Sequence, residues 1–141
     1  MVYIYAKLFK DEDIQELKSF AKEKNKKLVA FGSNFSWCDV NVNGAPWDFL
    51  AYIAGADYVC TGTFHGTLFS SLFRKNFVVV GNNNKKVDEL LNRFGLSDRK
   101  VNASNMRQVF NTEYDRDKLT ETIAQMREAG LGFLKENIEK I

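Results

Sequence analysis

The sequence has 141 residues, of which 45% are hydrophobic and 27% charged, a composition that predicts one globular domain and excludes a disordered chain. Its 20 basic and 18 acidic residues give a net charge of +2, which provides no broad basic field for a nucleic-acid backbone. No apolar run approaches the roughly 18 residues that a membrane-spanning helix requires, so we expect neither nucleic-acid binding nor a membrane span.

Cysteine usage points to a reducing compartment. Cys38 and Cys60 lie far apart and share no metal-binding spacing with the single histidine. We find no apolar secretion signal ahead of the first predicted strand. We therefore expect a cytoplasmic protein with no metal site and no bound cofactor.

The first part of the chain alternates strand and helix patterns. Residues 2–9 are rich in β-branched and aromatic side chains, which predicts a strand. Asp11 is a candidate N-cap for a helix with apolar residues at helical spacing up to Asn25. Residues 27–31 form a short apolar run that is typical of a buried parallel strand. Residues 32–44 lack a clear period and predict a loop.

The alternation continues through the second part. A helix should begin at Pro46, because proline suits the first helical position. Residues 57–61 and 77–81 predict two more strands, the second almost uniformly apolar. A strongly periodic helix follows Asn84 and should end at Gly95, which suits a left-handed C′ position.

The C-terminal part has weaker signals. Residues 99–102 predict a short edge strand. From Asp115 onward, apolar residues at helical spacing predict either two helical pieces or one helix that is kinked near Gly130 and Gly132.

Strands that alternate with helices indicate an α/β fold, a Rossmann-like three-layer domain over residues 1–141 with a mostly parallel sheet. Ligands of such folds bind outside the carboxyl ends of the strands. The loops at residues 32–43, 62–67 and 81–86 are therefore the candidate binding loops.

The stretch CTGTFHGTLFSS, residues 60–71, contains the single histidine, His65. We expect an almost wholly buried helix to begin within residues 63–66, so that its free backbone N–H groups point into the crevice and favour an anion. The imidazole of His65 would donate a proton or hold the anion. The alternative is that His65 only caps or packs the helix and that the neighbouring glycines only form the turn.

Two lysines, Lys85 and Lys86, begin the next predicted helix. Their charge opposes the positive end of the helix dipole unless an anion binds nearby. The alternative is that both side chains simply extend into water and that the residues before them, Asn82, Asn83 and Asn84, form only a turn and a helix cap.

These motifs resemble a known family. The segment TGTFHGTLFSSLFRKNFVVVG, followed by KKVDELLNRFGLSDRKV, is similar to the second half of polysaccharide pyruvyl transferases, in which an aromatic residue or Leu precedes His-Gly at the start of a helix. The likeness spans at least residues 46–101. It implies one half of a GT-B-like enzyme, with the N-terminal domain missing from this chain. Family members transfer a pyruvyl group from phosphoenolpyruvate to a sugar hydroxyl during exopolysaccharide biosynthesis.

Carried over residue by residue, the resemblance makes His65 the catalytic residue. The residues expected to bind the donor or its anion are Thr63, Phe64, Gly66, Thr67 and Lys86. Thr63 stands where the family often has Arg, which removes a bidentate partner for carboxylate or phosphate.

Two alternatives to pyruvyl transfer stay open. One is a GT-B-type glycosyltransferase domain that uses a nucleotide-sugar, and the other is a non-catalytic binding or assembly module. In either transferase reading we expect the isolated chain to be inactive, because half of the closing cleft is absent.

Overall fold

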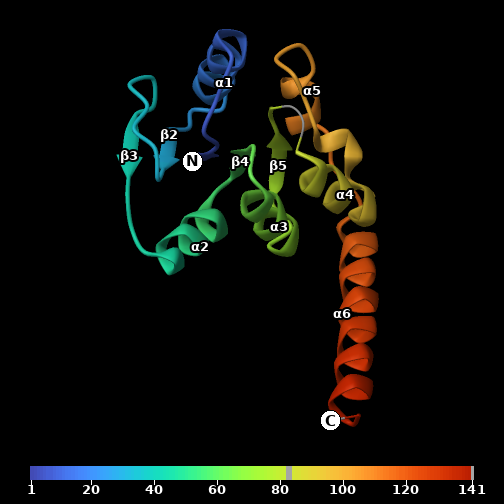
Figure 1. The fold of residues 1–141 in the computed structure, drawn as a ribbon. Helices are drawn as coiled ribbons and strands as arrows, with labels where there is room; N and C mark the ends of the chain where they lie inside the picture. Colours follow the sequence, from blue (N-terminus) through green and yellow to red (C-terminus); the bar gives the residue numbers. More distant parts are fainter. Residues whose placement is uncertain (82–83, 141) are drawn as a thin grey trace.

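Five parallel strands form the central sheet of the computed structural model, which describes residues 1–81 and 84–140 (Figure 1). They are β1 (Val2–Tyr5), β2 (Leu28–Phe31), β3 (Val40–Val42), β4 (Tyr58–Thr61) and β5 (Asn76–Val79). The order is β3-β2-β1-β4-β5, and every pairing is parallel. The strand order therefore reverses between β1 and β4, as in Rossmann-like sheets, and the predicted α/β fold is confirmed.

Helices cover both faces of this sheet. They are α1 (Asp11–Glu23), α2 (Pro46–Gly55), α3 (Phe64–Leu72), α4 (Lys85–Phe94), α5 (Met106–Phe110) and α6 (Arg116–Ile138), with a short 3₁₀ helix η1 (Ser97–Arg99). One face packs against α2, α3, α4 and the start of α6, and the other packs against α1 and α5. Helices on two faces of a parallel sheet explain why the strands read as continuous apolar runs.

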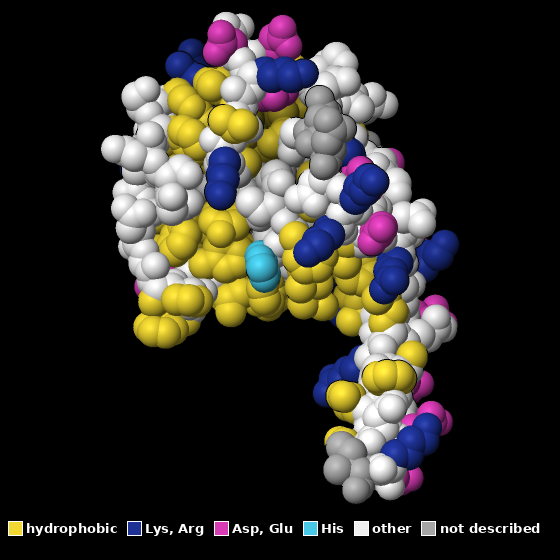
Figure 2. Space-filling view, in the orientation of Figure 1, with side chains coloured by type: hydrophobic (Ala, Val, Ile, Leu, Met, Phe, Trp, Pro, Cys, Tyr) yellow, Lys and Arg dark blue, Asp and Glu magenta, His cyan; other side chains and the backbone are white. Residues whose placement is uncertain are grey.

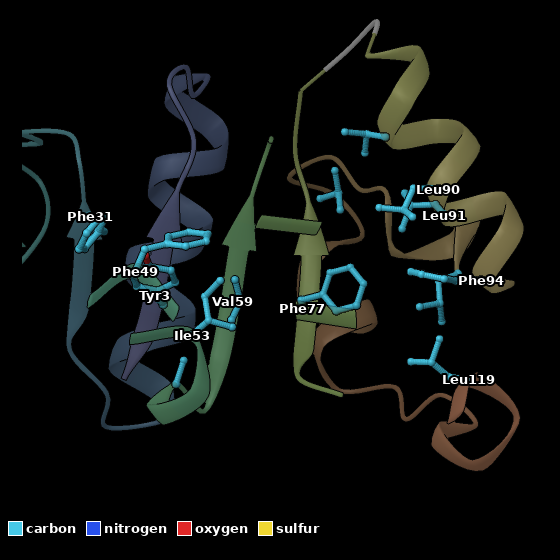
Figure 3. Close-up of a cluster of buried hydrophobic side chains, with 14 residues drawn as sticks. Tyr3, Phe31, Phe49, Ile53, Val59, Phe77, Leu90, Leu91, Phe94 and Leu119 are labelled. Atoms are coloured by element: carbon cyan, nitrogen blue, oxygen red, sulfur yellow. The ribbon is translucent and has the colours of Figure 1, made fainter. Parts of the chain in front are cut away.

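Alternate strand residues fill two separate cores. On β5, Phe77 and Val79 point into the first core, and Val78 into the second. Figure 3 shows the first core, where Phe77 of β5 points toward Leu91 and Phe94 of α4, and Val59 of β4 lies beside Ile53 of α2. The two-residue period of a strand divides its apolar side chains in this way.

Three predicted boundaries near the N-terminus were wrong. The first strand ends at Tyr5, not at residue 9, and residues 6–10 form a loop. Lys10, not Asp11, is the N-cap of α1, and Asp13 accepts a hydrogen bond from the Lys10 backbone N–H at 3.3 Å. The predicted loop 32–44 contains the edge strand β3, which has only three residues, too few to show a strand period.

The predicted edge strand at residues 99–102 is reduced to one parallel bridge between Val79 and Lys100. Arg99 belongs to η1 instead, and its side chain is fully buried. The guanidinium group donates to the carbonyl oxygen of Val109 at 2.7 Å and to the side-chain oxygen of Asn76 at 2.8 Å. Burial lowers the pKa of Arg99, and these hydrogen bonds join η1 to β5 and α5.

Helix α3 is not almost wholly buried, as the sequence predicted. Its buried residues are the small ones, Gly66, Thr67, Ser70 and Ser71. The large apolar side chains of this segment are partly or largely exposed, and Phe73 at its C-cap is 40% exposed. Small residues let the helix approach the sheet closely, and the bulky residues Phe64, Leu68 and Phe69 pack only partly against the first core.

Helix α6 is continuous through Gly130 and Gly132, so neither the two helical pieces nor the kink is observed. Leu119 at its start belongs to the first core, but every side chain of residues 124–140 is exposed. Figure 1 shows this part of α6 extending away from the sheet. Among the described helices, none combines the length and apolarity needed to cross a bilayer.

A pair of substitutions in α6 checks this packing. Leu119 is 1% exposed and Leu134 is 55% exposed. We expect Leu119→Ala to lower the free energy of unfolding by about 2–5 kcal/mol, because it leaves a cavity. Leu134→Ala should change it by less than about 0.5 kcal/mol. Urea denaturation of both variants measures the difference, and equal effects would contradict the described position of α6.

Candidate functional site

A cavity of about 660 Å³ lies where the strand order reverses. Its walls come from three loops that follow β1, β4 and β5, together with the first turn of α1 and residues 101–103. The lining residues include Lys7, Phe9, Lys10, Asp13, Thr63, Phe64, Gly81 and Asn84. Both its size and its place at the carboxyl ends of parallel strands are typical of a ligand site.

A network of threonine hydroxyls holds the turn between β4 and α3. The buried Thr61 hydroxyl donates to the Tyr5 carbonyl oxygen at 2.7 Å and accepts from the Thr63 backbone N–H at 3.2 Å. The Thr63 side chain caps α3 by accepting from the Gly66 N–H at 3.0 Å. The Thr67 hydroxyl donates back to the Thr63 carbonyl at 2.8 Å. The network joins the carboxyl ends of β1 and β4 to the start of α3.

This network reduces the number of free backbone N–H groups that the start of α3 can offer to an anion. The backbone N–H groups of Gly66 and Thr67 both donate to Thr63, at 3.0 and 3.1 Å. In the first turn of α3, the amides of Phe64 and His65 have no hydrogen-bond partner among the described residues. Two free amides are therefore available to a ligand, not the four that the sequence suggested.

Gly66 lacks a side chain where the side chains of Thr61 and Thr63 pack closely against it. A Cβ atom at Gly66 would lie 2.0 Å from the Thr61 hydroxyl oxygen, and one at Gly62 would lie 2.9 Å from the Val80 carbonyl oxygen. Both glycines thus permit close packing between the turn and the sheet. Protein packing alone explains why glycine is needed at these two positions.

His65 is exposed on the first turn of α3, and Figure 2 shows its imidazole at the protein surface. The cap of α3 is Thr63, so His65 is not the capping residue. Its ring meets the edge of the Phe64 ring at a centroid distance of 5.7 Å. Thr63 and Phe64 line the cavity, but His65 itself is not a lining residue.

Lys86 is exposed on the first turn of α4 and does not line the cavity. Asn84 does line it, and its side-chain oxygen caps α4 by accepting from the Val87 N–H at 3.3 Å. This confirms Asn84 as a cap. The neighbouring candidates Asn82 and Asn83 lie outside the described residues.

The sequence did not identify the loop at residues 6–10 as part of the site. Lys7 and Lys10 from this loop line the cavity. The loop is supported from behind by Phe9, whose ring packs edge-on against Phe35 at 5.6 Å and Trp37 at 5.2 Å. Loop 32–39 therefore supports the cavity wall instead of lining it. The available signal was that Lys7 interrupts the apolar pattern of the predicted first strand and that Lys10 directly follows it.

The chemistry of the site depends on imidazole, amine, carboxylate and backbone amide groups. Burial raises the pKa of Cys38 to about 12 and also raises that of Cys60, so neither thiol is a nucleophile near neutral pH. Within the described part of the chain, no three His, Cys, Asp or Glu residues are grouped to hold a metal ion.

A matched pair of glycine variants tests the turn. We expect Gly66→Ala to lower the free energy of unfolding by about 1–3 kcal/mol, because its methyl group collides with Thr61. Gly130→Ala, in open space on α6, should raise it by about 0.5–1 kcal/mol. Thermal or urea unfolding measures both, and a fully stable Gly66→Ala protein would contradict the described turn.

Three comparisons with known proteins bear on identity. The family model described as "Polysaccharide pyruvyl transferase" matches residues 1–84, which contain all five strands and the helices α1, α2 and α3. The motif that begins at Lys85 lies beyond this match. No curated protein sequence matches the chain.

Among solved structures, the crystal structure of the glycosyltransferase SnogD from Streptomyces nogalater is similar at a TM-score of 0.44 and 12% identity. The alignment covers 88% of this chain and 42% of that one, so this chain spans less than half the length of SnogD. The family match covers 84 of the 141 residues, including the loops after β1 and β4 that line the cavity. The chain belongs to the polysaccharide pyruvyl transferase family.

Proposed function

We propose that this chain is the donor-binding half of a polysaccharide-modifying transferase that moves a pyruvyl group from phosphoenolpyruvate to a sugar. The observation that carries the proposal is the cavity between the carboxyl ends of β1 and β4, lined by the turn that leads into His65. Membership of the family supports the same reaction class.

The reaction requires one proton donor and stabilisation of two anionic groups. C3 of phosphoenolpyruvate gains a proton, and a sugar hydroxyl adds to C2 with loss of its proton. The C2–O bond to phosphate breaks, and phosphate leaves with the bonding electrons. A second hydroxyl then adds and loses its proton to complete the ketal. We assign the proton donation at C3 to His65, since its exposed imidazole has no described hydrogen-bond partner.

Lysines from the β1–α1 loop supply the positive charge that Thr63 does not. Lys7 and Lys10 both line the cavity, and Lys86 does not. We therefore assign the phosphate and carboxylate of the donor to Lys7 and Lys10, with the free amides of Phe64 and His65 as further hydrogen-bond donors. Lys86 could reach a phosphate only from outside the cavity.

A nucleotide-sugar is the second candidate donor. The cavity is far larger than a three-carbon phosphoester needs, and the aromatic rings of Phe9 and Phe64 line it. An aromatic wall suits a nucleoside base. A nucleotide-sugar has a base that would contact these aromatic residues, and phosphoenolpyruvate has none.

We also propose that a second, N-terminal domain closes the site. Apolar side chains on α6 beyond the sheet are exposed in the described structure: Met126, Leu131, Phe133, Leu134 and Ile138. A patch of this kind is typical of a protein interface.

The cytoplasmic location stays a prediction.

Substitution of His65 tests the proposed chemistry in the full-length protein. We expect His65→Ala to lower kcat about 10²–10⁴-fold, the usual contribution of a positioned acid. The melting temperature should stay within about 2 °C, because the side chain is exposed. Phe73→Ala, also exposed and at the end of the same helix, is the control and should retain kcat. A large drop in melting temperature that accounts for the lost activity would support a packing role instead.

Ligand binding separates the two donors. The chain has one histidine, so the imidazole NMR signals report on His65 alone. We expect phosphoenolpyruvate to shift them saturably and uridine diphosphate to leave them unchanged. Saturable binding of the nucleotide alone would overturn the pyruvyl assignment in favour of a glycosyltransferase.

A further inference from the structure

Asp13 is a buried acid at the wall of the cavity. It is 7% exposed and lies in the first turn of α1, between Glu12, which is exposed, and the apolar face of the helix. No other acidic side chain is buried in the described part of the chain. Its place among the lining residues gives the carboxylate access to a bound molecule.

The charge of Asp13 lies in the first turn of α1, where it suits the positive end of the helix dipole. Its carboxylate accepts one hydrogen bond, from the Lys10 backbone N–H, and at 3.3 Å this bond is long. It forms no ion pair with any described residue. An amide oxygen of the same shape can keep this hydrogen bond, at the loss of a small helix-dipole stabilisation. Burying a carboxylate without an ionic partner is unfavourable unless other hydrogen-bond donors compensate it, and a molecule bound in the cavity would bring such donors.

We infer that Asp13 binds hydroxyl groups of a sugar in the cavity, an inference that rests on the proposed transferase function. An ionised carboxylate has acceptor sites only, so its ligand must bring hydrogen-bond donors. Phosphate and carboxylate groups would be repelled, and Lys7 and Lys10 offer them a better place in the same cavity. The hydrogen-bond donors that remain in the proposed substrates are the sugar hydroxyl groups.

Such hydroxyls have two sources, the acceptor sugar and the ribose of a nucleotide donor. Methyl glucoside and methyl galactoside serve as probes for the first. Uridine diphosphate and its 2′,3′-dideoxy analogue serve as probes for the second. Dissociation constants for these four probes and for phosphoenolpyruvate are measured by NMR titration of the full-length protein.

Asp13→Asn is the informative variant, because the amide oxygen can still cap α1 while the charge is lost. We expect its melting temperature to stay within about 2 °C of wild type. Affinity for the methyl glycosides or for uridine diphosphate should fall about tenfold or more, as for a lost hydrogen bond to a charged group. Affinity for phosphoenolpyruvate should not fall. Asp11→Asn, an exposed acid of the same turn that does not line the cavity, is the matched control and should leave every constant unchanged.

The outcomes separate this inference from the proposed function. Weaker glycoside binding identifies the acceptor sugar. Weaker uridine diphosphate binding, with the dideoxy analogue equally weak in both proteins, identifies ribose. The inference is wrong if no hydroxyl probe binds, if none weakens in Asp13→Asn, or if that variant loses several degrees of stability. A further outcome is that neither phosphoenolpyruvate nor the nucleotide binds the wild-type protein, while a glycoside binds wild type more tightly than Asp13→Asn. The proposed function is then wrong, and the inferred hydroxyl site is supported.

Discussion

The hydrogen bond from the Thr61 hydroxyl to the Tyr5 carbonyl oxygen is the constraint on which the site depends. It joins the last residue of β4 to the last residue of β1, at the place where the strand order reverses. Because Thr61 also accepts from the Thr63 N–H, the same side chain fixes the turn that starts α3. Gly66 must lack a side chain for this arrangement to close. The position of His65 thus follows from the packing of Thr61 against Gly66 at the start of α3.

The close approach of α3 to the sheet has a second consequence. Its small residues face inward, so its bulky apolar residues contribute to an exposed surface. Helix α6 adds a further apolar face beyond the sheet. Burial of these side chains would stabilise an assembly through the hydrophobic effect. This agrees with the proposal that the chain functions together with a second domain.

Charge is distributed unevenly around the cavity. Lys7, Lys10 and Asp13 come from the β1–α1 segment, and His65 follows the β4–α3 turn. One segment thus carries both the lysines that we propose to bind anions and the buried acid that we propose to bind hydroxyls. A substrate with a phosphate at one end and a sugar at the other would satisfy both, and this combination is what the proposed transfer reaction brings together.

The sequence by itself determined the alternation of elements, the parallel sheet and the start of α3 at the His65 motif, because apolar periodicity and turn residues act over a few positions. Local patterns also identified Asn84 as a cap. They could not give the strand order, which depends on pairing between residues far apart in the chain, such as Tyr5 with Thr61. The loops at residues 62–67 and 81–86 were predicted at the site, but only the tertiary structure decided that Lys7 and Lys10 join them in lining the cavity and that Asp13 is buried beside it. It also decided that α3 turns its small residues inward, because a helix with both small and large apolar residues is oriented by what it packs against.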